Sequence, residues 1–345
     1  MPQFDLTGHE LTSYDPPLQA PHDLDSFWEQ TLAETRAHDL APVVSRADSP
    51  LSVLESYDVS WRGFGGDPIC GWLHLPAGRA PGDGPLPAVI QYQGYGGGRG
   101  LVFENIFWAA AGYAHLVMDT RGQGSGWSTG DTPDTAGSAP AQPGYMTRGL
   151  TDPAEYYYRR VYADAVRAVE FIQTVDEVDG SAIAVTGASQ GGGLSLAVAA
   201  LADGVRAVMP DVPFLCDFRR STQVAMTNPY LEIVRYLAAH RDHEDVAFAT
   251  LSYFDGALLA RRASAPALFS VALMDETCPP STVYAAFNAY GGPKEIVTYA
   301  YNDHEGGEAF HKARQVGWLA ERFSAVGGEK QVARGSLVMW RENES

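Results

Sequence analysis

A strand–turn–helix pattern around Ser189 constrains the fold of this chain more than any other stretch. Residues 183–188 are typical of a buried strand, and residues 190–197 of a helix built from small and apolar side chains. Gly187 and Gly191 stand two positions before and two positions after the serine. Positions nearly free of side chain let one backbone pass another closely and hold the serine at a strained turn, with its hydroxyl pushed outward. The helix that follows directs the positive end of its dipole toward this hydroxyl. We therefore predict that Ser189 is a nucleophile. An ordinary glycine-rich turn is the alternative.

Strands and helices alternate on both sides of this turn. A G-x-S-x-G sequence between a strand and a helix is typical of the nucleophile elbow of the α/β-hydrolase fold. Two further runs, 51–60 and 69–75, have the pattern of an antiparallel hairpin. Later strands are expected at 88–92, 113–119, 205–210, 267–273 and 295–301, mostly with helical segments between them. Two of these helices are expected at 101–111 and 152–174. This alternation predicts an α/β fold with a mostly parallel, doubly wound sheet and helices on both faces.

The same patterns predict how the chain is divided. Residues 1–45 are expected to form an N-terminal arm with one helix, and residues 46–325 the α/β-hydrolase domain. Residues 214–260 interrupt the strand rhythm after the sixth expected strand, so we predict a helical insertion there. Residues 326–345 are expected to be a polar tail.

The composition indicates which binding partners and which cellular compartment to expect. The 345 residues carry a formal net charge of −18 and no run of lysine or arginine, which argues against a nucleic-acid or anionic-membrane partner. No apolar stretch approaches the roughly 18 residues of a membrane span, and the first residues lack the order of a signal peptide. Three widely spaced cysteines suit a reducing compartment. We expect a cytoplasmic protein.

The α/β-hydrolase order of catalytic groups is serine, then an acid, then histidine. Downstream of Ser189, Asp275 directly follows an expected strand and His304 follows the last one. The imidazole would take the serine proton near neutral pH, and the carboxylate would fix its tautomer and stabilise the imidazolium. Asp211 also follows a strand and is the rival acid. The other histidines are placed less well, in the arm, in a buried strand or within the last helix: His9, His22, His38, His115 and His311.

A glycine-rich loop at 93–100 follows the strand at 88–92. A dinucleotide site is excluded because the sixth position of G-x-G-x-x-G counted from Gly94 is Arg99. In the hydrolase architecture an early loop supplies the second oxyanion-hole N–H, which we assign to Tyr92 or a close neighbour. The alternative is a flexible loop with no role. Arg121, at the end of another strand, would either buttress these loops or form a surface ion pair.

Two further motifs contain residue types that can bind a metal ion. His240 and His243 offer no further ligands in register, so a solvated helix end is favoured. His304 begins an H-E-x-x-E sequence rather than H-E-x-x-H, which excludes a zinc peptidase of that kind. The long segment 127–150 is rich in turn-forming residues and is expected to be functional or an interface element.

These residues together resemble the acetyl xylan esterase/cephalosporin C deacetylase family, carbohydrate esterase family 7. The similarity extends from Phe4 to Phe310. It is carried by the following segments: Pro16-Pro17, Phe27-Trp28, Gln91-Tyr92-Gln93-Gly94-Tyr95, Gly97–Gly100, Arg121-Gly122-Gln123, Gly187–Gly193, 213–220, 274–280 and His304-Glu305.

The resemblance implies a catalytic triad of Ser189, Asp275 and His304, with oxyanion N–H groups at Tyr92 and Gln190. It implies substrate contacts at Tyr92, Gln190 and Pro213, and neither a metal nor another cofactor. It further implies deacetylation of short acetylated xylo-oligosaccharides and of cephalosporin C inside the cell, by a hexamer whose sites face an internal cavity. The hairpin region 51–75 and the long loops would then be interfaces. Another short-chain acyl esterase, a thioesterase or a peptidase of the same fold, or a non-catalytic protein of that fold, is the alternative.

Overall fold

One mixed β-sheet forms the centre of the computed structural model, which describes residues 3–80, 82–136 and 144–324. Within these residues nine strands pair in the order β1-β2-β3-β5-β4-β6-β7-β8-β9. They are β1 (Val43–Arg46), β2 (Leu54–Arg62), β3 (Pro68–Pro76), β4 (Leu86–Gln91), β5 (Ala114–Met118), β6 (Val178–Ala188), β7 (Val205–Asp211), β8 (Ala267–Ala272) and β9 (Lys294–Tyr299). β1, β2 and β3 pair antiparallel, and all pairs from β5 through β9 are parallel. The predicted α/β fold with a mostly parallel sheet is confirmed.

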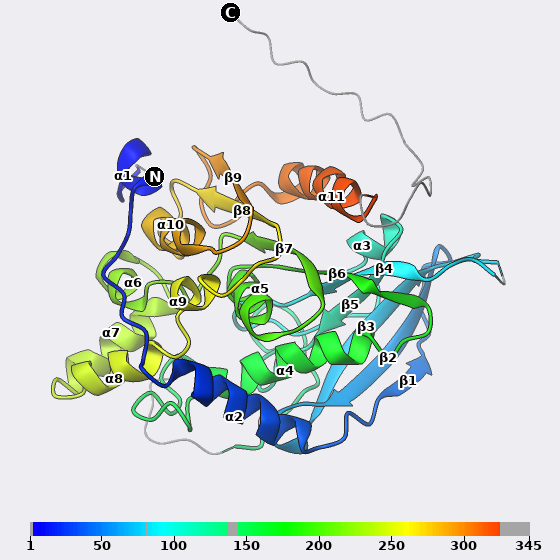
Figure 1. The fold of residues 1–345 in the computed structure, drawn as a ribbon, viewed down its shortest axis with the longest axis horizontal. Helices are drawn as coiled ribbons and strands as arrows, with labels where there is room; N and C mark the ends of the chain where they lie inside the picture. Colours follow the sequence, from blue (N-terminus) through cyan, green and yellow to red (C-terminus); the bar gives the residue numbers. More distant parts are fainter. Residues whose placement is uncertain (1–2, 81, 137–143, 325–345) are drawn as a thin grey trace, which may run out of the picture.

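Helices cover both faces of this sheet (Figure 1). One face carries α2 (Leu24–Arg36), α4 (Tyr157–Ile172), α5 (Gln190–Leu201), α9 (Gly256–Ala260) and α10 (Pro280–Ala289), and the other carries α3 (Phe107–Ala110) and α11 (Glu308–Ser324). Side chains alternate between the faces along β4: Ala88 and Ile90 join the larger core, whereas Val89 packs with Trp108 and Trp318 on the side of α3 and α11. A strand that is buried on both faces is apolar throughout, which explains its continuous hydrophobic run.

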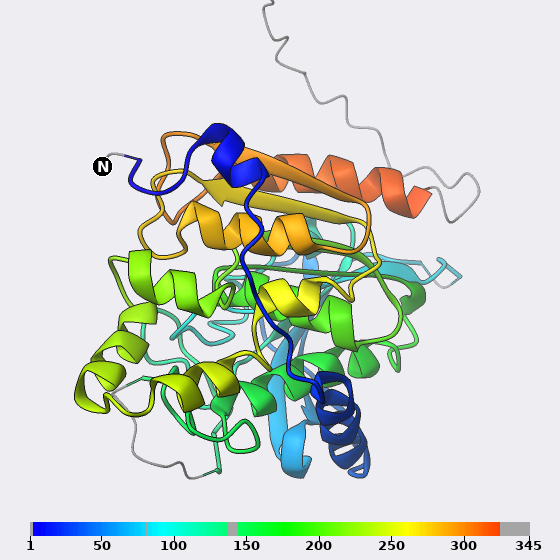
Figure 2. The same cartoon turned by 60° about the vertical axis from the view of Figure 1, so that its left-hand side comes forward.

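The predicted insertion between β7 and β8 is a set of helices. It consists of α6 (Phe218–Val224), α7 (Tyr230–Ala239), α8 (Glu244–Leu251) and α9. The N-terminal segment runs from α1 (Gly8–Thr12) past α10 and α9 to α2 (Figure 2). Trp28 of α2 stacks on Tyr162 of α4 and donates its indole N–H to the carbonyl of Tyr253 at 3.0 Å. The arm is therefore packed onto both the helical layer and the insertion.

Several boundaries differ from the sequence expectation, and three of these differences have a local cause. β1 lies at the edge of the sheet with all four residues exposed, so no apolar alternation marked it and its start fell inside the expected arm. The helix expected at 101–111 is reduced to α3, because Glu104 folds back to accept the N–H of Leu101 in a turn. α4 begins at Tyr157 instead of Asp152, since the Asp152 carboxylate accepts the N–H of Ala154 in another turn. The expected tail at 326–345 lies outside the described residues.

Candidate active site

Ser189 lies at a sharp turn between β6 and α5, as its flanking glycines predict. Its φ and ψ angles are 56° and −118°, a conformation that non-glycine residues rarely adopt. The turn is held to the sheet because the N–H of Ser189 donates to the Asp211 carbonyl at 2.9 Å. A Cβ atom on Gly191 would lie 2.2 Å from the Tyr92 carbonyl oxygen, and one on Gly187 would lie 2.7 Å from it. Both positions therefore require glycine for close backbone approach.

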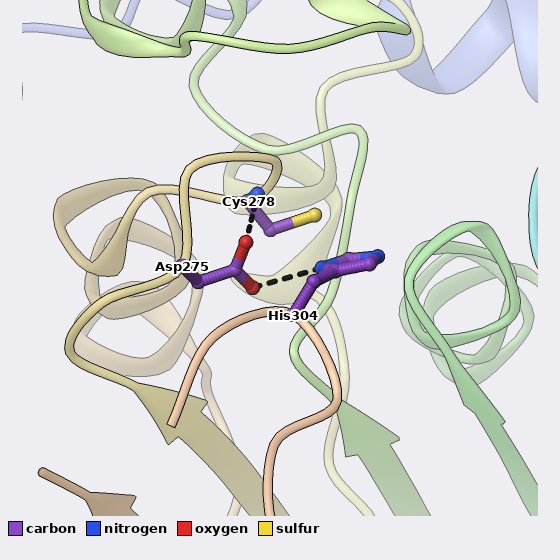
Figure 3. Close-up of side chains that lie close together, drawn as sticks. All are labelled: Asp275, Cys278 and His304. Atoms are coloured by element: carbon purple, nitrogen blue, oxygen red, sulfur yellow. Dashed lines mark hydrogen bonds and ion pairs between the residues drawn. The ribbon is translucent and has the colours of Figure 1, made fainter. Parts of the chain in front are cut away.

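Asp275 and His304 meet at the ends of β8 and β9, the positions predicted for acid and base. Asp275 Oδ2 lies 2.9 Å from His304 Nδ1 (Figure 3). The other carboxylate oxygen accepts the N–H groups of Thr277 and Cys278, each at 2.8 Å. These bonds hold a fully buried carboxylate in one orientation, and its bond to Nδ1 leaves the other ring nitrogen of His304 free to accept a proton.

The environment of His304 favours its protonated form. Burial alone would lower the pKa of the imidazole, but the hydrogen bond and charge of Asp275 outweigh it, with further help from the Asp303 and Glu305 carboxylates. The net effect raises the pKa of His304 above its ordinary value of 6.5.

Ser189 and His304 line one cavity of about 830 Å³. Its walls come from the segments after β4, β5, β6, β8 and β9, from the end of β7, from the insertion and from the first part of α11. Further lining residues include Tyr92, Tyr95, Asn105, Trp127, Asn228, Pro229, Thr277, Glu305 and Lys312. In the part of the chain that the structure describes, the Ser189 hydroxyl makes no hydrogen bond to His304. Such bonds are often long without substrate and tighten in the complex.

Cys278 lies beside this pair, with its Sγ 4.0 Å from the Ser189 Oγ. Ligand atoms of Asp275, Cys278 and His304 lie within 4.8 Å of one another, a spacing that a metal ion could use. However, the Asp275 oxygens are already occupied by hydrogen bonds, and burial raises the pKa of the Cys278 thiol, which keeps it protonated. A protonated thiol is a poor metal ligand, so this donor set fits a proton-transfer pair better than a metal centre.

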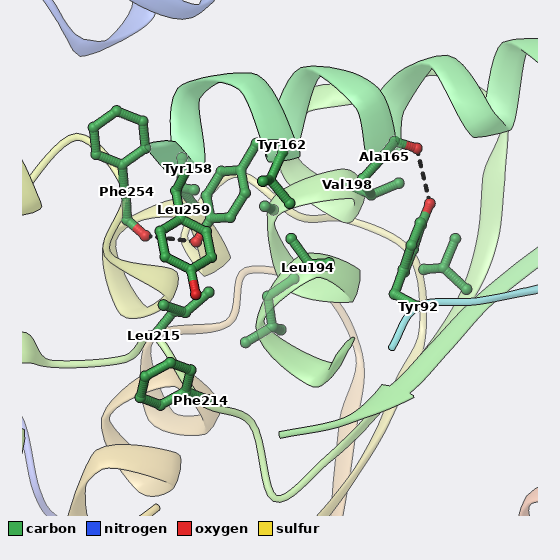
Figure 4. Close-up of a cluster of buried hydrophobic side chains, with 14 of the residues drawn as sticks. Tyr92, Tyr158, Tyr162, Ala165, Leu194, Val198, Phe214, Leu215, Phe254 and Leu259 are labelled. Carbon is green, nitrogen blue, oxygen red and sulfur yellow. Dashed lines mark hydrogen bonds between the residues drawn. The ribbon is translucent and has the colours of Figure 1, made fainter. Parts of the chain in front are cut away.

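The backbone N–H of Tyr92, which was expected to be an oxyanion donor unless a close neighbour took that role, already has an acceptor in the sheet. Its N–H donates to the Thr186 carbonyl at 2.9 Å, because the pairing of β4 with β6 continues through this residue. Its ring is buried, and its hydroxyl donates to the carbonyl of Ala165 on α4 (Figure 4). Tyr92 thus contributes to the sheet and core, although the residue also lines the cavity.

Tyr95, a close neighbour in the same loop, is a candidate for this role. It lines the cavity beside Ser189, and within residues 3–80, 82–136 and 144–324 its N–H has no acceptor. Gln190 is the first residue of α5, where backbone N–H groups have no partner inside the helix. The Gln190 side chain accepts from Gln123 and from Tyr158, each at 2.9 Å, so it is fixed away from the reaction. Gln123 also accepts the N–H of Gly96 at 2.7 Å and thereby ties the two candidate donors together.

Comparison with known proteins places the chain in a family. The model of the acetyl xylan esterase family matches residues 1–322. A solved acetyl xylan esterase from Paenibacillus sp. is 40% identical, with a TM-score of 0.86, over 92% of this chain and all of that one. A second, from Thermoanaerobacterium sp., is 32% identical with a TM-score of 0.84, over 93% of this chain and all of that one. The chain belongs to the acetyl xylan esterase family.

A curated relative, an acetyl esterase of Xylanibacter ruminicola, is 27% identical over 294 residues. The match covers 84% of this chain but only 64% of that esterase, so the relative is a longer protein. In the described residues of this family member, no helix has both the length and the apolar character needed to cross a bilayer.

Asp211, the alternative candidate for the catalytic acid, contacts His311 and not His304. Its Oδ1 lies 3.0 Å from His311 Nε2 and accepts a hydrogen bond from Gln315 at 2.9 Å. Both partners are on α11. Asp211 therefore joins that helix to the sheet, while Asp275 is the carboxylate in contact with His304.

Arg121 forms a buried ion pair that joins α4 to the β2–β3 turn, so it is neither a surface ion pair nor a direct support of the glycine-rich loop. Its side chain is fully buried and binds both carboxylate oxygens of Asp164 on α4, at 2.5 and 2.8 Å. It also lies 3.1 Å from Asp67 and donates to the carbonyl of Phe64 in the short 3₁₀ helix η1 (Phe64–Gly66). The Arg121 carbonyl accepts from Tyr157, which connects the R-G-Q motif to α4.

Of the predicted substrate contacts, Pro213 is not among the described residues that line the cavity. Its backbone lies against the first turn of α5 instead, where a Cβ atom on Gly192 would lie 3.0 Å from the Pro213 Cα. Sequence reasoning missed Asn228 and Pro229 from the insertion and Trp127 from the long loop. Only the position of Trp127, directly after the R-G-Q-G-S-G run, gave a local signal. Residues 137–143 of that loop lie outside the described residues.

Proposed function

We propose that this chain is a serine esterase that removes acetyl groups from acetylated xylo-oligosaccharides. One observation carries the proposal. Ser189, at its strained turn, lines the same cavity as His304, which is hydrogen-bonded to Asp275. Membership of the acetyl xylan esterase family supports acetyl as the acyl group that is removed. The two solved acetyl xylan esterases match the chain along nearly its full length.

The proposed reaction runs through an acyl-enzyme. Ser189 Oγ attacks the ester carbonyl carbon while His304 Nε2 takes its proton. The imidazolium is stabilised by Asp275 and gives this proton to the leaving alcohol oxygen as the C–O bond breaks. His304 then removes a proton from water, the resulting hydroxyl attacks the acetyl carbonyl, and acetate leaves as Ser189 regains its proton.

The oxyanion would be held by two backbone N–H groups, those of Gln190 and Tyr95. Gln190 retains the role expected of the residue after the nucleophile, and Tyr95 takes the place expected for Tyr92. The positive end of α5 adds to this stabilisation. Donors that are fixed before reaction stabilise developing charge without reorganisation, which is why the Gln123 contacts to both segments matter.

Three finer expectations remain part of the proposal. Cephalosporin C is a second substrate, since it presents an acetate on a bulky alcohol. The chain assembles into a homo-hexamer, and the protein is cytoplasmic. The formal net charge of −18 is compatible with a neutral oligosaccharide as substrate. The same charge disfavours a nucleic-acid or anionic-membrane partner, and we propose neither.

Acetate release from 4-nitrophenyl acetate, acetylated xylobiose and cephalosporin C tests the proposal, with wild type beside Ser189→Ala. We expect activity on all three and a loss of kcat/KM on the order of 10⁴ or more in the variant. Activity on the nitrophenyl ester alone would keep the mechanism and reject the sugar assignment. Turnover that survived Ser189→Ala would reject Ser189 as nucleophile, and cleavage of an aminoacyl amide in preference to these esters would indicate a peptidase.

A further inference from the structure

Trp127 is a large aromatic side chain left exposed beside the candidate nucleophile. Its relative exposure is 64%, yet it lines the same cavity as Ser189 and His304. It comes from the segment after β5, on the side of the cavity formed by the glycine-rich loop. An exposed indole at the mouth of a cavity is a surface that water covers poorly and that a ligand can bury.

The indole is held in place although most of its surface is free. Its Nε1–H donates to the carbonyl of Tyr95 at 2.9 Å. Its ring rests on glycine backbone: a Cβ atom on Gly97 would lie 2.2 Å from the ring, and one on Gly94 would lie 3.3 Å from it. These glycines leave the space in which the ring is seated, so its orientation is fixed before any ligand arrives.

The segment that carries Trp127 is also anchored. The carbonyls of Ser128 and Thr129 accept the N–H groups of Gly98 and Gly100, at 3.2 and 2.8 Å. A few residues further on, the Asp119 carboxylate accepts the N–H groups of Asp131 and Thr132 at 2.6 and 2.8 Å. A ring fixed in this way loses little conformational entropy when a ligand stacks on it, which favours binding.

The rest of the cavity wall suits a ligand with hydroxyl groups. Asn105, Asn228, Thr277, Glu305 and Lys312 line it and offer both hydrogen-bond donors and acceptors. A pyranose ring has axial C–H groups that form an apolar face and hydroxyls around its edge. An aromatic platform with a polar rim matches both features, whereas a simple alkyl alcohol would use neither.

We propose that Trp127 is the stacking platform for the sugar ring of the leaving alcohol, and so forms a pyranoside subsite next to the nucleophile. This inference rests on the proposed function, because it names what the alcohol side of that reaction binds. Trp127 acts here on binding and specificity. The triad and the oxyanion N–H groups act on the acetyl group itself.

The test compares two esters in wild type, Trp127→Ala and Trp127→Phe. Acetylated xylobiose carries the sugar, and ethyl acetate is the reference because a nitrophenyl ring could itself stack on the indole. In Trp127→Ala we expect kcat/KM for acetylated xylobiose to fall about tenfold more than kcat/KM for ethyl acetate, mainly through KM, with Trp127→Phe recovering most of the loss. Phe310→Ala is the matched control, because Phe310 is 86% exposed and is not among the described cavity residues.

Equal losses on the two esters would overturn the proposal, since they would mean that Trp127 only supports the Tyr95 loop. No loss on either would also overturn it. Binding of unacetylated xylobiose to Ser189→Ala and to Ser189→Ala/Trp127→Ala, measured by calorimetry, gives a readout without turnover. Weaker binding to the double variant than to Ser189→Ala supports the stacking platform, even if wild type hydrolyses neither ester. If wild type hydrolyses neither ester, the proposed function is rejected, but the stacking platform is not.

Discussion

His304 is the residue whose protonation controls the proposed reaction. Its pKa is raised above 6.5 because contact with Asp275 outweighs the effect of burial. Only the neutral imidazole can take the serine proton, so a raised pKa lifts the pH at which the enzyme becomes active. The contribution of this pair to folding stability changes with pH in the opposite direction. The attraction between imidazolium and carboxylate contributes fully below pH 6.5 and is lost as the pH rises through the raised pKa.

The pH dependence of kcat/KM tests this residue pair. We expect activity on an acetyl ester to rise with pH through a midpoint above 6.5. In Asp275→Asn the midpoint should move to lower pH, because burial lowers the pKa of His304 and the Asp275 charge that opposes this effect is gone. We also expect kcat to fall by a factor on the order of 10⁴. A variant with the same midpoint and rate as wild type would show that Asp275 does not act through His304.

Gly191 illustrates a second constraint at the scale of one residue. A Cβ atom there would lie 2.2 Å from the Tyr92 carbonyl oxygen, a backbone atom that cannot move without shifting β4. We expect Gly191→Ala to lower the free energy of unfolding by about 1–3 kcal/mol, as measured by denaturant titration. Gly317→Ala is the matched control, since Gly317 lies within α11 with nothing near its Cβ direction. That change should stabilise the protein by about 0.5–1 kcal/mol.

At the scale of elements, α7 of the insertion is connected to the proposed oxyanion hole. The Tyr95 hydroxyl lies 2.8 Å from both carboxylate oxygens of Glu232 and accepts the N–H of Tyr145 at 2.6 Å. Glu232 also accepts the N–H of Met146 at 3.2 Å. Burial raises the pKa of its carboxyl despite these hydrogen bonds. The insertion thus fixes the ring of the residue that we propose as an oxyanion donor.

Removal of this contact should act on rate more than on binding. We expect Glu232→Ala to lower kcat about tenfold with little change in KM, less than the 10²- to 10³-fold lost when an oxyanion donor itself is removed. Glu232→Gln keeps acceptor oxygen and should recover most of the rate. Glu244→Ala is the control, because Glu244 is an exposed acid on α8 paired with Arg219. Equal effects of the Ala and Gln variants would argue against positioning.

At the scale of the whole molecule, β1 leaves an apolar edge uncovered. Val43 and Val44 are 57% and 50% exposed, and among the described strands β1 pairs only with β2. An exposed edge strand with apolar side chains is open to pairing with another chain. It adjoins the hairpin region that the family resemblance assigns to an interface, and therefore supports the proposed assembly.

Light scattering tests the assembly. We expect a mass near six times that of the 37.2 kDa chain, and a clearly smaller mass for Val43→Lys/Val44→Lys at the same concentration. Phe310→Lys, on the exposed side of α11, should leave the mass unchanged. A monomeric wild type would reject the hexamer, and an unchanged double variant would place the interface elsewhere.

Local patterns determined much of this fold and its site. The glycines around Ser189 predicted the elbow, because close backbone approach depends on side-chain size alone. Strand ends predicted where Asp275 and His304 would lie, since parallel strands bring their carboxyl ends to one edge. Such inferences need only neighbours along the chain or a general rule of topology.

Contacts between distant segments decided the rest. Pairing of β4 with β6 engages the N–H of Tyr92, whereas the N–H of Tyr95 has no acceptor among the described residues. No feature of the loop sequence reveals this difference. Asp211 meets His311 of α11, and Arg121 meets Asp164 of α4, so their roles depend on helices packed from elsewhere. Trp127 acquires its place at the cavity from glycines about thirty residues earlier. Which polar group is satisfied, and which is left facing the cavity, is settled only when the tertiary structure assigns every partner.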